Sequence, residues 1–161
     1  MTDKEKMADE AAKLFLDRFH WSQAILGACA KLFREEPPSD DLIAALSPFG
    51  GGMASSGQIC GILPGALAVI GFTLGKTKSQ DKDHKLMWKI SQQMVSKFAE
   101  ITSRYGGSNC FDIARVNWKD REAVKQFYKN PDSNRKNCVK VIRETSDYLH
   151  TLITDNFPEK D

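Results

Sequence analysis

The chain has 161 residues, of which 41% are hydrophobic and 27% charged, an ordinary balance for a globular domain. Its length fits one hydrophobic core, so we expect a single domain over residues 1–161. The formal net charge is only +2, and basic residues are mixed with acidic ones along the chain. This pattern excludes the concentrated basic patch that nucleic-acid binding requires.

The sequence contains no evident targeting or membrane-spanning segment. Residues 2–18 are charged throughout and lack the apolar stretch of a secretory signal. The longest apolar run, Ile59–Gly75, is interrupted by Pro64 and is shorter than the roughly 20 residues of a spanning helix. We therefore expect no membrane span and a reducing cytoplasmic location. In that compartment four cysteines favour metal or redox chemistry over structural disulfides.

The first predicted helix is the longest. Thr2–Glu5 has the pattern of a capping box, and helical spacing continues to about Arg34, before two prolines. The apolar stripe of this helix recurs at steps of three and four and includes Phe15, Phe19, Leu26, Cys29 and Phe33. We expect this stripe to face the core.

The rest of the chain also has helical patterns, separated by turn residues, and no run favours a strand. The expected helices are one capped by Ser39 and ending at about Leu46, an apolar one over about Ile59–Leu74, an amphipathic one over His84–Tyr105, a short one capped by Ser108, one over Asp120–Tyr128, and a last one that begins at Ser133 or Asn134 and ends before Pro158. The fold class is therefore all-α, a single-domain bundle of about five to seven helices.

Three cysteines share a position near the start of a predicted helix. Cys60 follows a glycine-rich turn and precedes the apolar helix, Cys110 follows the Ser108 cap, and Cys138 lies in the first turns of the last helix. The positive end of a helix favours a thiolate, which is both the nucleophile and the metal ligand. This shared placement indicates either one joint site or three separate core cysteines.

Several motifs resemble the redox-active C_GCAxxG_C_C family over about residues 15–152. The segment FGGGMASSGQICGILPGALAVIG, which contains Cys60, is similar to the central CGAxxG element of that family. Upstream, SQAIL resembles its first helix, and YGGSNC and NC, which contain Cys110 and Cys138, match its last two cysteines. The resemblance implies a redox- or metal-linked role carried by clustered cysteines, with Cys60, Cys110 and Cys138 as ligands.

The chain departs from the family pattern at two positions. Trp21 stands where the family has its first cysteine, and Ile62 replaces the alanine of CGAxxG. Cys29 lies eight residues along the same predicted helix, about 12 Å away, so we interpret it as a core residue rather than a substitute ligand. Trp21 would fill the ligand's space with an apolar ring, which leaves an altered or vestigial site.

Three thiols restrict the cofactors that the site would accept. Zinc is satisfied by three cysteines with a histidine or water, whereas an iron–sulfur cluster usually takes four ligands. His20, next to Trp21, is the candidate fourth ligand, and Gly61 and Trp21 complete the expected cofactor-binding set. No CxxCH motif is present, so we expect no covalent c-type haem.

Three functions remain open at this stage. The first is a small metal- or iron–sulfur-binding protein that exchanges electrons with a redox partner. The second is a thiol–disulfide redox protein, in which two of the three cysteines form a reversible bridge. The third is a structural or interaction module, such as a homodimer formed through apolar helix faces, with a degenerate cysteine site. The sequence has no nucleotide-binding, zinc-protease or hydrolase motif and leaves open whether the protein is an enzyme.

Overall fold

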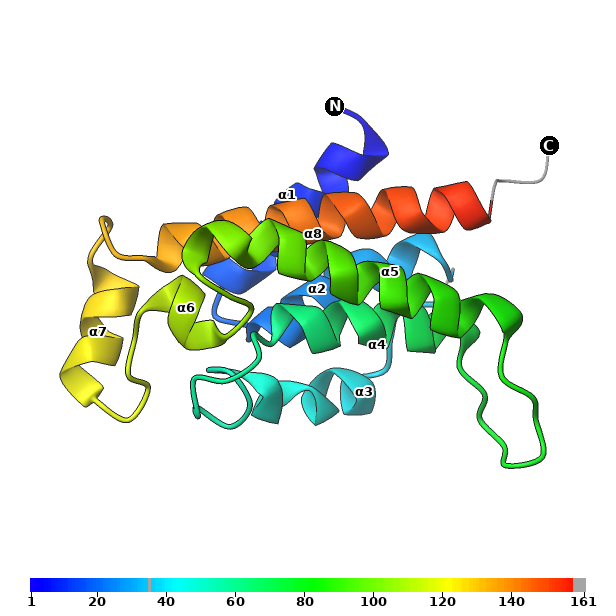
Figure 1. Cartoon of the computed structure of the whole chain (residues 1–161), viewed down its shortest axis with the longest axis horizontal. Coiled ribbons are helices and arrows are strands. Elements are labelled where there is room, and N and C mark those ends of the chain that lie inside the picture. The colour runs from blue at the N-terminus through cyan, green and yellow to red at the C-terminus, as the bar shows by residue number, and fades with distance from the viewer. Residues whose placement is uncertain (35, 158–161) are drawn as a thin grey trace.

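The computed structural model describes residues 1–34 and 36–157, and its regular elements are helical (Figure 1). Within these residues there are eight α-helices and three short 3-10 helices, and no strand longer than an isolated bridge. The predicted all-α class is confirmed. The number of helices exceeds the predicted five to seven because the first predicted helix is two helices.

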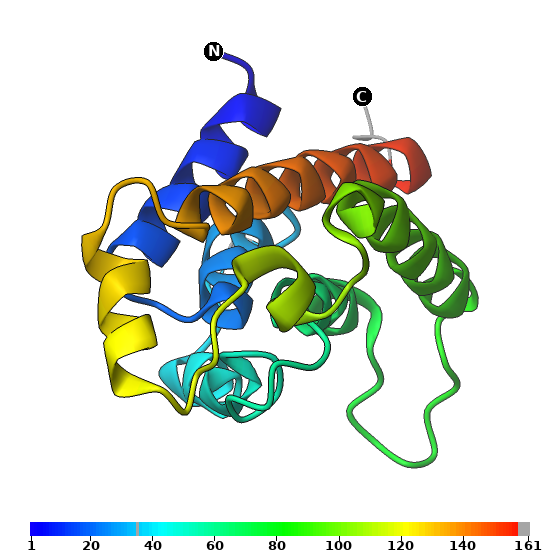
Figure 2. The same cartoon turned by 60° about the vertical axis from the view of Figure 1, so that its left-hand side comes forward.

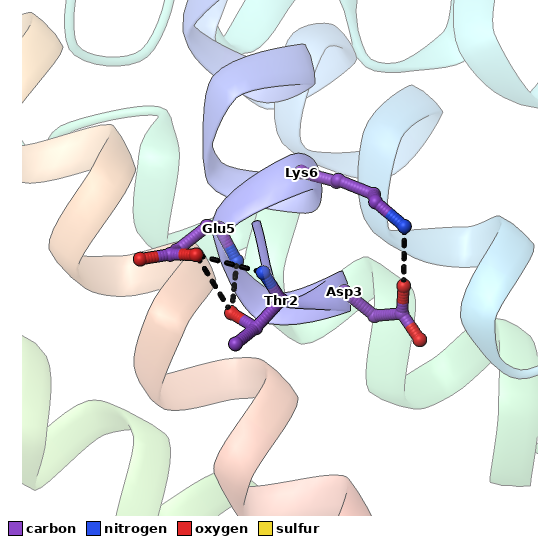
Figure 3. A network of polar contacts seen from close by, with 4 residues as sticks. All are labelled: Thr2, Asp3, Glu5 and Lys6. Atoms are coloured by element: carbon purple, nitrogen blue, oxygen red, sulfur yellow. Dashed lines mark hydrogen bonds and ion pairs between the residues drawn. The ribbon is translucent and has the colours of Figure 1, made fainter.

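Helix α1 (Asp3–Leu16) begins at the predicted capping box. The backbone N–H of Glu5 donates to Thr2 Oγ1 at 3.2 Å, and the backbone N–H of Thr2 donates to Glu5 Oε2 at 2.7 Å (Figure 3). An ion pair between Lys6 and Asp3, 3.0 Å apart, lies on the same turn (Figure 3). These contacts satisfy N–H groups that a helix start leaves without partners.

The prediction of one continuous helix to Arg34 is wrong. Arg18 has a φ of 78°, in the left-handed region, which right-handed helices exclude. Helix α2 (Trp21–Cys29) then starts afresh and is followed by the 3-10 turn η1 (Ala30–Leu32). Phe19 lies in this break with 43% of its surface exposed, so it does not belong to the buried stripe.

The other helices lie close to their predicted positions. They are α3 (Asp40–Ala45), η2 (Ser47–Phe49), α4 (Ile62–Leu74), α5 (Lys85–Thr102), η3 (Ser103–Tyr105), α6 (Cys110–Ala114), α7 (Arg121–Lys129) and α8 (Arg135–Asn156). The cap of α6 is Asn109 and not the predicted Ser108. Helix α8 ends before Pro158, as predicted, although Pro158 itself lies outside the described residues.

The centre of the bundle is made by α2 and α4, which are almost entirely apolar and lie side by side. Their close approach depends on Gly65, because a Cβ there would lie 2.7 Å from Ser22 Cα and 2.3 Å from Ile25 Cγ2. Helix α8 covers this pair together with α1 and α5 (Figure 2). Within the described part of the chain, no helix is both long and apolar enough to cross a membrane.

The short helices α6 and α7 are placed at one end of the bundle. Helices α6 and α7 and the 50–61 loop gather where α8 begins, while the 75–84 loop projects from the opposite end (Figure 1). Asn137 on α8 donates from Nδ2 to the Ile113 carbonyl of α6 at 3.3 Å, which fixes these two helices to each other. All three predicted site cysteines lie on the segments of this end.

Candidate functional site: a buried cluster of three thiols

The glycine-rich loop is joined to the start of α6 by backbone pairing. Ile59 and Asn109 form an isolated antiparallel bridge. The N–H of Cys60 donates to the Ser108 carbonyl at 3.0 Å, and the N–H of Cys110 donates to the Gln58 carbonyl at 2.6 Å. In this register Cys60 and Cys110 are diagonal neighbours on one face of the bridge, so we expect their Cα atoms to be about 7–8 Å apart.

The loop reaches this position through a left-handed turn. Residues 51–55 all have φ between 53° and 73°, although only Gly51 and Gly52 lack a side chain. Each of the three non-glycine residues costs roughly 1–2 kcal/mol in this conformation. Gly52 allows the close approach, because a Cβ there would lie 2.6 Å from the Cβ of Cys110. Such strain is typical of functional sites.

Helix α8 contributes the third thiol. Cys138 is its fourth residue, and Cys60, Cys110 and Cys138 are each only 1% exposed. Burial raises the pKa of Cys138 well above the ordinary thiol value, and negative charge on Cys60 and Cys110 would raise this pKa further. Charge on one of these sulfurs affects the others only because they are close to one another. The fold therefore brings the three predicted thiols together.

Burial decides the protonation state of these thiols. It raises the pKa of Cys110 to about 11, and it raises that of Cys60 further, with negative charge on Cys110 as a second cause. The predicted helix-start positions are present, but the helix ends do not produce thiolates because desolvation outweighs them. At neutral pH the thiols are therefore protonated and weak as nucleophiles.

Trp21 forms one wall of the cluster. It is 1% exposed, its ring stacks on Phe15 at a centroid distance of 5.1 Å, and it meets Trp118 edge-on at 5.4 Å. Its indole N–H lies near Cys138, where it lowers the pKa of that thiol, and the indole N–H of Trp118 does the same for Cys110.

Neither indole N–H makes a hydrogen bond of ordinary geometry. Both Nε1 atoms are buried, and neither has an acceptor within hydrogen-bond geometry among the described residues. The thiols that they approach are weak acceptors when protonated. A thiolate is a much stronger acceptor, so the two indole N–H groups favour charged sulfur, against the larger opposing effect of burial.

The remaining predicted site residues have different surroundings. His20 is exposed at the start of α2, with its ring against Gly50, so this placement gives no support to its predicted role as a ligand. Gly61 is buried, and a Cβ there would lie 2.6 Å from the Phe49 carbonyl oxygen. Close packing against the backbone therefore explains why this position is a glycine.

Cys29 is a core residue, as interpreted from the sequence. It is fully buried and its Sγ lies 3.8 Å from Ser146 Oγ on α8. Burial raises its pKa to about 12, and the only other contribution is the hydrogen bond to Ser146. Cys29 is therefore a useful control for the three clustered thiols.

The cluster does not have the arrangement of a preformed metal site. Within residues 1–34 and 36–157, no three His, Cys, Asp or Glu side chains are arranged to hold a metal ion. The four cysteines are also free thiols. The donor set of three sulfurs suits a soft metal or a cluster, but the sulfurs would have to move closer together to bind a single ion.

Trp118 is the site residue that sequence reasoning did not identify. It lies in the connector between α6 and α7 and packs edge-on against Phe127 at 5.1 Å. The available signal was a large aromatic residue within a mostly polar connector, since an indole there needs both a packing surface and an N–H partner.

The chain matches the family described as "Putative redox-active protein (C_GCAxxG_C_C)" over residues 19–152. Because this match spans most of the 161 residues, the chain belongs to that family. No curated protein and no solved structure is significantly similar to it. The family match covers Cys60, Cys110 and Cys138, and it begins just before Trp21.

Proposed function

We propose that this member of the C_GCAxxG_C_C family is a redox-linked protein that holds a metal ion or an iron–sulfur centre through Cys60, Cys110 and Cys138. The observation that carries the proposal is the pair of buried indole N–H groups, of Trp21 and Trp118, that approach the thiols without an acceptor. Buried donors almost always have partners in proteins, and negatively charged sulfur would supply them.

A bound cation would also resolve the cost of charge in this cluster. Thiols must lose their protons to become ligands, and a cation compensates for the negative charge that burial disfavours. The three sulfurs would hold the group, and an iron–sulfur centre would supply one-electron chemistry when bound. The indoles would exclude water and donate toward two of the sulfurs, and any fourth ligand would come from outside the three thiols.

Metal analysis of protein purified without oxygen tests this function. We expect stoichiometric metal, with visible absorption if the centre is iron–sulfur, and loss of both in C60S, C110S and C138S. The matched control is C29S, because Cys29 is equally buried but lies apart from the cluster. Metal-free, colourless protein after reconstitution with iron and sulfide, and separately with zinc, would overturn the proposal.

A second candidate is reversible disulfide formation, favoured by the diagonal placement of Cys60 and Cys110 across the bridge. Two thiols would lose two protons and two electrons to a partner disulfide, which would become a dithiol as the new S–S bond forms. A separation of about 7–8 Å exceeds the usual disulfide range, so the backbone must move. Reversible loss of two free thiols under a dithiol–disulfide couple, absent in C60S, would identify this reaction.

A further inference from the structure

Two tryptophans from distant parts of the chain enclose the thiol cluster. Trp21 begins α2 and Trp118 lies between α6 and α7, yet their rings meet at 5.4 Å with an interplanar angle of 76°. Phe127 packs against both rings, at centroid distances of 6.4 and 5.1 Å. This aromatic packing holds the indoles in fixed orientations, which sets the direction of their N–H groups.

We propose that Trp21 and Trp118 are positioning residues of the thiol centre, whose indole N–H groups donate to the sulfurs of Cys138 and Cys110 when those sulfurs are charged. The inference rests on the proposed thiolate centre and assigns a role to the position where the family has a cysteine. On this reading Trp21 exchanges a ligand for a hydrogen-bond donor, and the site is altered rather than vestigial.

The contacts pair each indole with a different sulfur. The indole of Trp21 lies beside the Cys138 side chain, and that of Trp118 lies beside the Cys110 side chain. The adjacent glycines of the loop show the second pairing directly, since a Cβ on Gly51 would lie 3.2 Å from Trp118 Cγ and one on Gly52 would lie 2.6 Å from Cys110 Cβ. Both Nε1 atoms are buried and lack another acceptor among the described residues. Buried polar groups without a partner are rare in proteins, and both of these lie against the same cluster. A packing role alone would not require two indole N–H groups at these positions.

The proposed exchange of a cysteine ligand for Trp21 has a consequence for the charge of the centre. Three thiolates carry one negative charge fewer than four, and two N–H donors withdraw charge from the sulfurs that remain. Both effects would stabilise the reduced form of an iron–sulfur centre if one were bound by these thiols, since net charge and hydrogen bonds to sulfur set its potential. We expect a higher reduction potential than a four-thiolate centre would have in the same surroundings.

Binding of Cd²⁺ to the reduced full-length chain tests the proposal. The sulfur-to-metal charge-transfer band reports binding, and its pH midpoint reports how easily the thiols lose protons. We expect W118F and W21F to bind Cd²⁺ about 10–100-fold more weakly, as with other partners of metal ligands, with the midpoint at higher pH. W88F is the matched control, because Trp88 is 60% exposed and its Nε1 bonds to Asp83 at 3.1 Å.

Equal affinity and an equal midpoint in W118F and the parent would overturn the proposal while leaving the metal function intact. If the parent binds no Cd²⁺, the metal function fails, and a metal-free measurement then decides the role of the indole. In a C29S/C60S/C138S background, the NMR shift of the Cys110 Cβ gives the pKa of that thiol alone. Addition of W118F should raise this pKa, and no change would reject the role of Trp118. Circular dichroism verifies that each variant is folded.

Discussion

Addition of one methyl group at Gly52 should disrupt the thiol site more than any other glycine-to-alanine change in the loop. Gly52 has a φ of +73°, and an added Cβ would lie 2.5 Å from the Gln58 carbonyl oxygen and 2.6 Å from Cys110 Cβ. The left-handed backbone costs about 1–2 kcal/mol for alanine, and the overpacking costs typically 1–3 kcal/mol. We therefore expect Gly52→Ala to lower the free energy of unfolding by about 2–5 kcal/mol.

Urea unfolding of reduced protein measures this loss, and Gly71→Ala is the matched control. Gly71 lies inside α4 with no atom within 4 Å of an added Cβ, so alanine there should stabilise the protein by roughly 0.5–1 kcal/mol. The hydrogen bond from the Cys110 N–H to the Gln58 carbonyl should also be lost in G52A, because the loop must move away from α6. A G52A variant within about 0.5 kcal/mol of the parent would refute this account of the loop.

Three further predictions concern stability. The pKa values of Cys110 and Cys29 are raised to about 11 and about 12, so unfolding releases protons above about pH 8.5. Stability is full below that pH and should fall by about 1.4 kcal/mol per pH unit and thiol as pH rises toward the folded values; urea unfolding in pH steps measures this. Gly65→Ala, with its Cβ 2.7 Å from Ser22 Cα, should cost about 1–3 kcal/mol in a thermal melt. Arg135→Lys should cost about 1–2 kcal/mol by urea unfolding, because the guanidinium lies 5.1 and 5.2 Å from two aromatic ring centres.

A specific outcome would contradict each of these three predictions. A free energy of unfolding that stays constant from about pH 8 to about pH 11 would mean that the buried thiols ionise as freely in the fold as in the unfolded chain. An unchanged melting temperature for G65A would mean that α2 and α4 are not held at the distance described. Unchanged stability in R135K would show that a point charge replaces the planar guanidinium fully.

Local signals in the sequence predicted most helix starts correctly. Thr2, Ser39 and Asp120 each accept hydrogen bonds from the first turn of the helix that follows, and such caps depend only on neighbouring residues. The break at Arg18 could not be predicted in this way, because no glycine or proline marks it. Helix α1 packs against both α2 and α8, and these are tertiary contacts that a local sequence pattern does not encode.

The sequence selected three cysteines that lie close together in the fold, but it did not reveal what surrounds them. Motif resemblance selected Cys60, Cys110 and Cys138, and the fold brings them together. Trp118 was missed because its proximity to Trp21 depends on how α6 and α7 turn back toward α2, which no local pattern encodes. The preference of Met53 for a right-handed conformation likewise opposes its observed φ of 58°, so tertiary contacts override local preference in the loop.

The bridge between Ile59 and Asn109 has a consequence for how this architecture can diverge. The hydrogen bonds that flank it use the backbone amides of Cys60 and Cys110 and not their sulfurs. Every residue type except proline provides such an amide. A descendant of this protein could therefore exchange both thiols for other side chains and still inherit the junction between the loop and α6. New chemistry could thus arise on an unchanged frame.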